Sequence, residues 1–206
     1  MSTRRVWLAV LATAVLLRLL TLGAYPLHDT TEARYAEIAR IMAVSGNWVT
    51  PQIEPGVPFW AKPPLSTWAS AVSFKLLGFS EFAARLPVFL LTLLMLLVVF
   101  ALGRRLFGEV AATAACVIAL TTTVGFIDAG AVMTDAALLL ATTIALASFC
   151  AAIPGPGTVA RYGLFAGVGL GLLAKGPIAV VLTGIPIFAW TLWKKDLDWL
   201  WRSFHW

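Results

Sequence analysis

Four charged residues of this sequence stand where their side chains could take part in chemistry. Asp29 and Glu32 are three residues apart, Lys62 precedes two prolines, and Asp135 follows a threonine. A carboxylate can remove the proton of an attacking hydroxyl group, and a lysine can stabilise an anionic leaving group. Each position also suits a structural role. Spacing alone favours Asp29 and Glu32 as a helix capping box, Asp135 as a helix cap, and Lys62 as a lysine snorkelling beside aromatic residues.

The composition indicates what kind of molecule must position these side chains. The chain has 206 residues, of which 60% are hydrophobic and 12% charged, and its mean hydropathy is +0.89. A soluble domain carries about 25% charged residues, and disordered chains are poor in hydrophobic ones. The sequence therefore predicts an all-α, polytopic membrane protein. The net charge is +5, but no basic run with interleaved aromatic residues accompanies it, so nucleic acid is not an expected partner.

Apolar runs that approach the ~30 Å hydrocarbon core of a bilayer mark the expected membrane spans. Four runs predict one span each, and a longer fifth run holds a single charge, Lys175. A helix break at Gly176–Pro177 would divide the fifth run into two short spans that meet at Lys175. We therefore expect six spans, which lie in Val6–Ala24, Leu86–Gly103, Val110–Ile127, Ala136–Ala160 and Tyr162–Trp193.

The orientation follows from the segment between the first two runs. We expect it to hold a short helix over Thr31–Val44 and an apolar stretch, Pro64–Phe79, that does not cross the membrane. The basic residues that flank the spans then fall on one side, which the positive-inside rule makes the cytoplasm. Both termini are expected there. The predicted organisation is one domain, with a first span (1–24), a periplasmic or juxtamembrane loop (25–85), the remaining spans (86–193) and a cytoplasmic tail (194–206).

This topology collects charged residues at the outer face, although they were not used to derive it. Acids and lysines gathered at one face of a helical membrane protein indicate a polar site there. Asp128 and Lys175 therefore join the candidates, and we expect Asp29 and Asp135 to lie within ~15 Å, about three helical turns, of each other. The residues that gather are Asp29, Glu32, Lys62, Asp128, Asp135 and Lys175.

Several motifs, in the same order along the chain, resemble a known group of enzymes. They are Asp29–Glu37, Ser45–Pro51, Trp60–Leu65, Glu81–Pro87, Gly103–Gly108, Met133–Asp135 and Leu173–Pro177. Over nearly its whole length the chain resembles the bacterial aminoarabinose transferases and protein O-mannosyltransferases. This resemblance implies a GT-C-fold glycosyltransferase of the cell inner membrane. Such an enzyme transfers a sugar from a polyprenyl-phosphate donor to a lipid acceptor of the lipid A or lipopolysaccharide type, or to a protein, at the periplasmic face.

The resemblance also implies roles for individual residues. Asp29, Glu32 and Asp135 correspond to the catalytic acids, and Lys62 and Arg34 would lie near the donor phosphate. The sequence departs from the usual pattern at two points. Many members have adjacent Asp and Glu in the first motif, where this chain has Thr31 before Glu32, so the choice between Asp29 and Glu32 stays open.

The second departure concerns the cofactor. Many members have a glutamate before Lys-Pro-Pro, a residue linked to metal binding, and here it is Ala61. The cysteines, Cys116 and Cys150, lie in apolar runs and belong to no metal motif. We assign no metal-ligating residue, and the resemblance leaves the cofactor undetermined.

Two other functions fit a polytopic membrane protein. A transporter of lipid-linked sugars would need broken helices near the middle of the membrane, and the break after Lys175 fits that requirement. A non-catalytic membrane subunit is the other alternative. Members of the resembled group are far longer than this chain. The resemblance therefore implies an N-terminal portion, inactive alone, which is either a truncated reading frame or works with a separately encoded C-terminal half.

Overall fold

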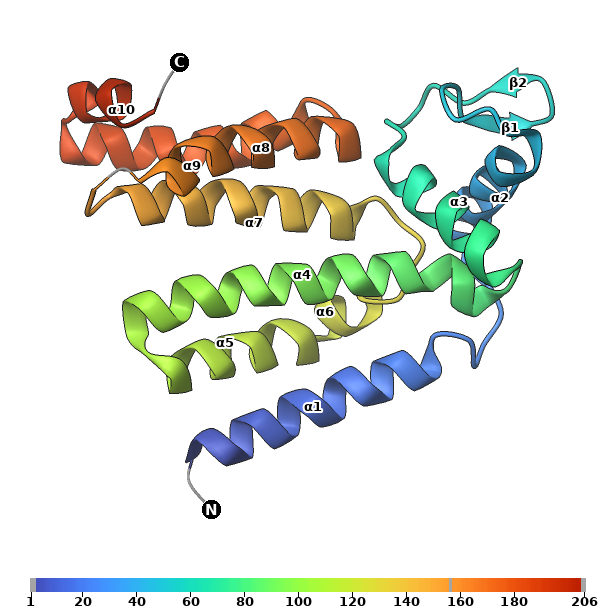
Figure 1. The fold of residues 1–206 in the computed structure, drawn as a ribbon, viewed down its shortest axis with the longest axis horizontal. Coiled ribbons are helices and arrows are strands. Elements are labelled where there is room, and N and C mark those ends of the chain that lie inside the picture. Colours follow the sequence, from blue (N-terminus) through green and yellow to red (C-terminus); the bar gives the residue numbers. More distant parts are fainter. Residues whose placement is uncertain (1–2, 156, 205–206) are drawn as a thin grey trace.

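The computed structural model describes residues 3–155 and 157–204, and these residues are mostly helical. The expected all-α fold is confirmed. Six helices run roughly along one axis (Figure 1), and they are accompanied by the short helices α6 (Thr123–Asp128) and α10 (Leu197–Ser203) and by two further helices at one end of the bundle. The six are α1 (Thr3–Thr21), α4 (Glu81–Phe107), α5 (Glu109–Thr121), α7 (Asp135–Ala152), α8 (Thr158–Lys175) and α9 (Ile178–Lys194).

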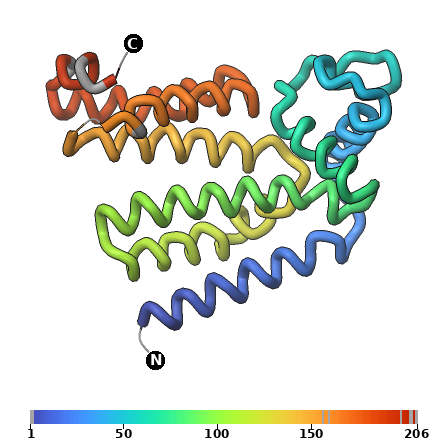
Figure 2. Tube along the Cα trace, viewed as in Figure 1, coloured from blue at the N-terminus to red at the C-terminus, as the bar shows by residue number. Residues whose placement is uncertain are grey.

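The helices lie side by side in a fixed order that differs from their order in sequence. Figure 2 shows α1 next to α5, then α4, then α7, with α8 and α9 beyond, and neighbours in this order contact each other. The start of α1 and helix α10 lie at the same end of the bundle (Figure 1), which we call the terminal end. Among the described helices, α4 and α7 are long and apolar enough to cross a membrane, while α5 and α9 are shorter apolar helices. Six crossings stay a prediction.

The opposite end, which we call the loop end, carries the segment between α1 and α4. It holds α2 (Thr30–Ser45), α3 (Leu65–Leu77) and an antiparallel hairpin of β1 (Gln52–Glu54) and β2 (Val57–Pro58) (Figure 1). Helix α2 extends one residue beyond the predicted helix at each end. A buried cluster that includes Met42, Ala71 and Phe74 joins α2 and α3 to the start of α4. The loop end is therefore a packed cap on the bundle.

Two breaks in the apolar runs shape the loop end. Gly176 has a positive φ of 75°, which ends α8 after Lys175, and α9 begins at Ile178 just after Pro177. This break matches the predicted one, because proline lacks the N–H that a helix interior needs. The second break was not predicted. Thr122 ends α5, and its side chain accepts a hydrogen bond from the N–H of Gly125 at the start of α6.

Helix α8 carries three glycines at close contacts with its neighbours, Gly163, Gly167 and Gly171, which we call the glycine ridge. Gly163 and Gly167 lie close against α7, and Gly171 lies closest to Ala179 of α9. A Cβ added at Gly167 would lie 2.6 Å from the backbone nitrogen of Ala145 and 2.7 Å from the carbonyl oxygen of Ala141. Small residues at this spacing let membrane helices approach backbone to backbone. The ridge therefore sets how the start of α7 and the end of α8 face each other at the loop end.

Candidate functional site

The first part of the site is an ion pair between the ends of two adjacent helices. Asp135 is the first residue of α7 and Lys175 is the last residue of α8, and Lys175 Nζ lies 2.5 Å from Asp135 Oδ1. Each charge also suits its helix end, since helix dipoles favour acids at the N-terminus and bases at the C-terminus. The interpretation of Asp135 as a helix cap is wrong, because α7 starts at Asp135 itself and its carboxylate binds Lys175 instead.

Two further side chains lie in the electric field of this pair. Burial raises the pKa of the Tyr35 phenol, an effect that Lys175 and Arg34 oppose and Asp135 reinforces. Burial and then the negative charge of Asp135 raise the pKa of Asp128, which lies just beyond the apolar run of its helix, while Lys175 lowers it. The structure thus brings Asp128 and Tyr35 to the Asp135–Lys175 pair. Sequence reasoning missed Tyr35, although it stands in the first motif between Arg34 and Glu37.

The segment that carries Lys62 lies beside the Asp135–Lys175 pair, in a region of the loop end that we call the corner. A Cβ added at Gly176, the residue after Lys175, would lie 4.0 Å from Cγ of Pro63. On the other side of Lys62, the ring of Phe59 meets the ring of Tyr35 edge to face, with centroids 6.2 Å apart. Lys62 itself is half-buried. Two lysine motifs far apart in sequence are therefore neighbours at the loop end.

Asp29 caps α2, as its spacing predicted. Its Oδ1 accepts hydrogen bonds from the backbone N–H of Thr31 at 2.7 Å and of Glu32 at 3.2 Å. These two bonds, with a smaller contribution from the positive charge of Arg34, hold the pKa of Asp29 below its usual value. Asp29 and Arg34 are both exposed. Arg34 acts on Asp29 and on Tyr35, so it links the acid to the corner, while the predicted approach of Asp29 to Asp135 stays a prediction.

Glu32 has a different environment from the one a capping box or an active site requires. It is buried, and its two carboxylate oxygens accept hydrogen bonds from Nε and Nη2 of Arg85 at 2.9 and 3.0 Å. Oε1 also accepts the N–H of Val132 at 3.1 Å. The expected capping box is therefore only half correct, since Asp29 caps the helix and Glu32 binds elsewhere.

Arg85 is the centre of this arrangement. Its side chain is fully buried, and besides Glu32 it donates hydrogen bonds to three backbone carbonyls that follow α1: those of Leu22, Tyr25 and Pro26. An arginine has five N–H donors, and all five have acceptors here. The guanidinium also lies 3.9 Å from the centre of the Tyr25 ring. Helices α1, α2 and α4 and the segment before Asp135 thus meet at one side chain.

A second buried arginine holds the connection that carries Asp128. Arg18 of α1 donates to the carbonyl of Ile127 and to the hydroxyl of Tyr25, both at 3.0 Å. Its guanidinium also lies over the ring of Phe126. Arg18 and Arg85 therefore share Tyr25 and together fix both segments that lead to the acids. The charge that interrupts the first apolar run is explained by these contacts.

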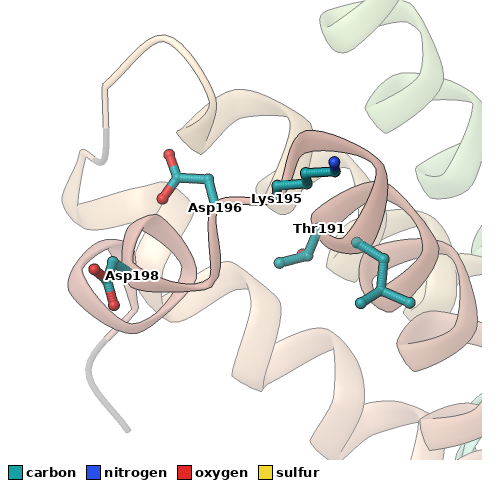
Figure 3. Close-up of a pocket in the computed structure, with 5 residues that line it drawn as sticks. Thr191, Lys195, Asp196 and Asp198 are labelled. Atoms are coloured by element: carbon teal, nitrogen blue, oxygen red, sulfur yellow. The ribbon is translucent and has the colours of Figure 1, made fainter.

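The described residues include no group of three or more His, Cys, Asp or Glu side chains placed to hold a metal ion. Cys116 and Cys150 are free thiols. A hollow of about 420 Å³ lies at the other end of the molecule, between α9 and α10 (Figure 3). There Lys195 extends away from Asp196 and Asp198, and none of the candidate site residues lines the hollow. The candidate chemistry is therefore confined to the loop end.

Comparison with known proteins gives one consistent result. Residues 2–206 match the family model described as dolichyl-phosphate-mannose-protein mannosyltransferase. The undecaprenyl phosphate-alpha-4-amino-4-deoxy-L-arabinose arabinosyl transferase of Edwardsiella ictaluri is 31% identical over 202 residues, which are 96% of this chain and 36% of that protein. The transferase of the same name, numbered 2, from Pseudomonas fluorescens is 29% identical over 200 residues, which are 95% of this chain and 36% of that protein.

Solved structures agree with the sequence matches. The crystal structure of ArnT from Cupriavidus metallidurans bound to undecaprenyl phosphate superposes with a TM-score of 0.88 at 30% identity, over 100% of this chain and 38% of that chain. The same protein in the apo state gives a TM-score of 0.84. The chain spans little more than a third of the length of the relatives it matches.

Proposed function

The chain belongs to the dolichyl-phosphate-mannose-protein mannosyltransferase family, and we propose that it forms the N-terminal, acid-bearing part of a membrane glycosyltransferase. The donor is a sugar carried on a polyprenyl phosphate, and the acceptor is a lipid of the lipid A type or a protein. The reaction takes place at the loop end, on the periplasmic side of the inner membrane, with both termini in the cytoplasm. One observation carries the proposal: the chain superposes over its full length on a protein crystallised with undecaprenyl phosphate.

The corner at the loop end has the charges that a donor phosphate requires. Lys62 and Lys175 come from segments that touch through Pro63 and Gly176. Lys175 is already paired with Asp135, so the pair can orient its ammonium group toward an incoming phosphate. Arg34 is exposed one turn from Asp29 and adds a third cation. In a partly dry site these groups stabilise the negative charge that develops on the departing polyprenyl phosphate.

The bond changes assign a task to Asp29. An acceptor oxygen forms a bond to the anomeric carbon of the sugar, the bond from that carbon to the phosphate oxygen breaks, and its electron pair stays on the phosphate. A hydroxyl acceptor must lose its proton, and a carboxylate can take it. Asp29 has a lowered pKa and is exposed, so it is ionised at neutral pH and accessible. If the acceptor is itself a phosphate, no proton has to be removed, and Asp29 orients it.

Glu32 has a positioning role in this proposal rather than a catalytic one. All of the strong contacts of its carboxylate are with Arg85 and with the N–H of Val132. These contacts place the start of α2, and thus Asp29, relative to the Val132–Asp135 segment.

Binding of undecaprenyl phosphate to the purified chain tests the proposal without depending on turnover. Lys62→Gln and Lys175→Gln should each weaken binding about tenfold or more, as expected for loss of a charge-assisted hydrogen bond. Asp135→Asn should weaken binding less than either lysine variant, because it loosens the orientation of Lys175 but also removes a negative charge beside the phosphate. Lys75→Gln is the matched control, since Lys75 is an exposed lysine of α3 that lies over the ring of Trp48 instead. Equal binding by all four variants and the unaltered chain would refute the donor site.

A further inference from the structure

An apolar groove lies along α4 and α7, the two described helices that are long and apolar enough to cross a membrane, and away from the acids. Helix α7 forms its floor, and α4 and α8 form its sides, since α7 packs against both. Its volume is about 880 Å³, and apart from Arg105 and Ser148 its lining is apolar or glycine. Residues that represent the three walls are Leu97, Ala101, Ile144, Ala147 and Gly163.

The length of the groove matches the thickness of one leaflet of a bilayer. Along α4 the lining runs from Leu94 to Arg105, which at 1.5 Å per residue is about 16 Å. Half of a hydrocarbon core is about 15 Å thick. The groove ends at the terminal end, beside Gly155 and Gly157, where an added Cβ would meet no atom within 4 Å. The groove is therefore open at the terminal end, where Arg105 also belongs to its lining.

Arg105 lies at this open end with its charge uncompensated by protein. The ion pairs among the described residues do not include Arg105, and the nearby acid Glu109 pairs with Arg4 instead. Arg104, its neighbour, does not line the groove and lies near the ring of Phe100. Basic pockets between membrane helices attract the head groups of anionic lipids.

We propose that this groove binds one anionic phospholipid from the leaflet at the terminal end, with an acyl chain along α7 and its phosphate at Arg105. The apolar groove, which is as long as one leaflet is thick, favours a lipid acyl chain. Arg105 at its open end favours a negatively charged head group. This site is independent of the sugar donor site, which lies at the opposite end of the same helices.

Native mass spectrometry of the purified 206-residue chain tests the proposal, with phosphatidylglycerol and phosphatidylcholine of identical acyl chains as probes. The chain should retain one phosphatidylglycerol and prefer it about fivefold over phosphatidylcholine, the effect expected of one arginine near a membrane surface. Arg105→Gln should remove this preference, and Arg104→Gln, at the same helix end, should keep it. Loss of the preference in both variants would indicate general surface charge and overturn the site.

A second pair of variants tests the groove itself. Ala101 is exposed and lines the groove, so Ala101→Trp fills it without displacing a buried residue and should reduce retention of both lipids. Leu90→Trp is the control, because Leu90 is exposed on the same helix but outside the groove. Unchanged retention by Ala101→Trp would overturn the proposal. So would a dimer of the chain that retains no lipid, since that result would assign the groove to a second copy.

Discussion

The buried pair of Glu32 and Arg85 gives the sharpest test of how the loop end is built. Glu32→Gln keeps the size of the side chain but removes its charge, and it leaves the fully buried guanidinium of Arg85 without a counter-ion. Removing one partner of a buried ion pair costs about 3–5 kcal/mol, because the remaining charge is uncompensated. The variant also offers only one acceptor oxygen to the three N–H groups that now bind Glu32. We therefore expect a large loss of stability.

The chain provides a matched control on the same helix. Glu37 pairs with Arg40 at 2.7 Å, but both side chains are about half exposed, with relative accessibilities of 48% and 44%. An exposed pair of this kind contributes about 0.3–0.5 kcal/mol. Glu37→Gln should therefore change the free energy of unfolding by much less than Glu32→Gln. Denaturant unfolding of each purified variant in the same detergent, followed by tryptophan fluorescence, gives the comparison.

The outcome separates two roles for Glu32. If Glu32 positions the loop end, Glu32→Gln unfolds at clearly lower denaturant than Glu37→Gln, and limited proteolysis cuts the segment around α2 faster. If Glu32 instead serves as a reacting acid, its neutral variant should fold as well as Glu37→Gln while function is lost. Equal unfolding midpoints for the two variants would refute the positioning role.

Three further predictions concern other parts of the structure. Gly167→Leu should destabilise the fold by about 1–3 kcal/mol, because the new side chain is overpacked against Ala141 and Ala145. Gly169→Leu is the control and should not destabilise the fold, since a Cβ added there meets nothing within 4 Å. Thermal unfolding of the two variants gives the comparison. Asp128→Asn should raise stability at neutral pH relative to the unaltered chain, because the raised pKa of Asp128 means that its ionised form is disfavoured in the folded state; a lower unfolding temperature at pH 7 would contradict this. The lowered pKa of Asp29 means that the stability contributed by its capping is present above the ordinary carboxyl pKa and is lost as the pH falls through the pKa of the folded state. The cap itself is tested by circular dichroism at neutral pH. Asp29→Ala should show less helix than Asp29→Asn, because asparagine keeps a capping oxygen.

The apolar runs of the sequence and its helix-breaking residues were sufficient to predict most of the helices. The apolar runs located the long helices, and the Gly176–Pro177 pair located the break after Lys175, because both signals are local properties of the chain. The break at Thr122 was missed, since threonine inside an apolar run is common and its capping bond depends on the geometry of the next turn. The start of α4 at Glu81 rather than near Leu86 follows from the Ser80 cap, which lies outside the apolar run.

The partners of the charged residues could not be predicted in the same way. Glu32 and Arg85 are 53 residues apart, and Lys175 and Asp135 are 40 apart. Which acid meets which base depends on how helices pack, and that depends on features such as the glycine ridge, whose effect is steric and long-range. The sequence could predict that these residues lie at one face of the membrane, because helix length and charge asymmetry determine the face. It could not predict which acid forms an ion pair with which base.

The displaced acid of the first motif shows how local structure can restore a sequence pattern. The resemblance implies that many members have an acid directly before the glutamate, where this chain has Thr31, and the preceding acid of this chain, Asp29, is two residues earlier. In the structure, the Asp29 side chain folds over the start of α2, and its Oδ1 lies 2.7 Å from the backbone nitrogen of Thr31. One oxygen of the Asp29 carboxylate therefore lies beside the backbone nitrogen of residue 31, although residue 31 is not an acid. Because Glu32 is held by Arg85, Asp29 is the acid of this motif whose charge stays available at the surface.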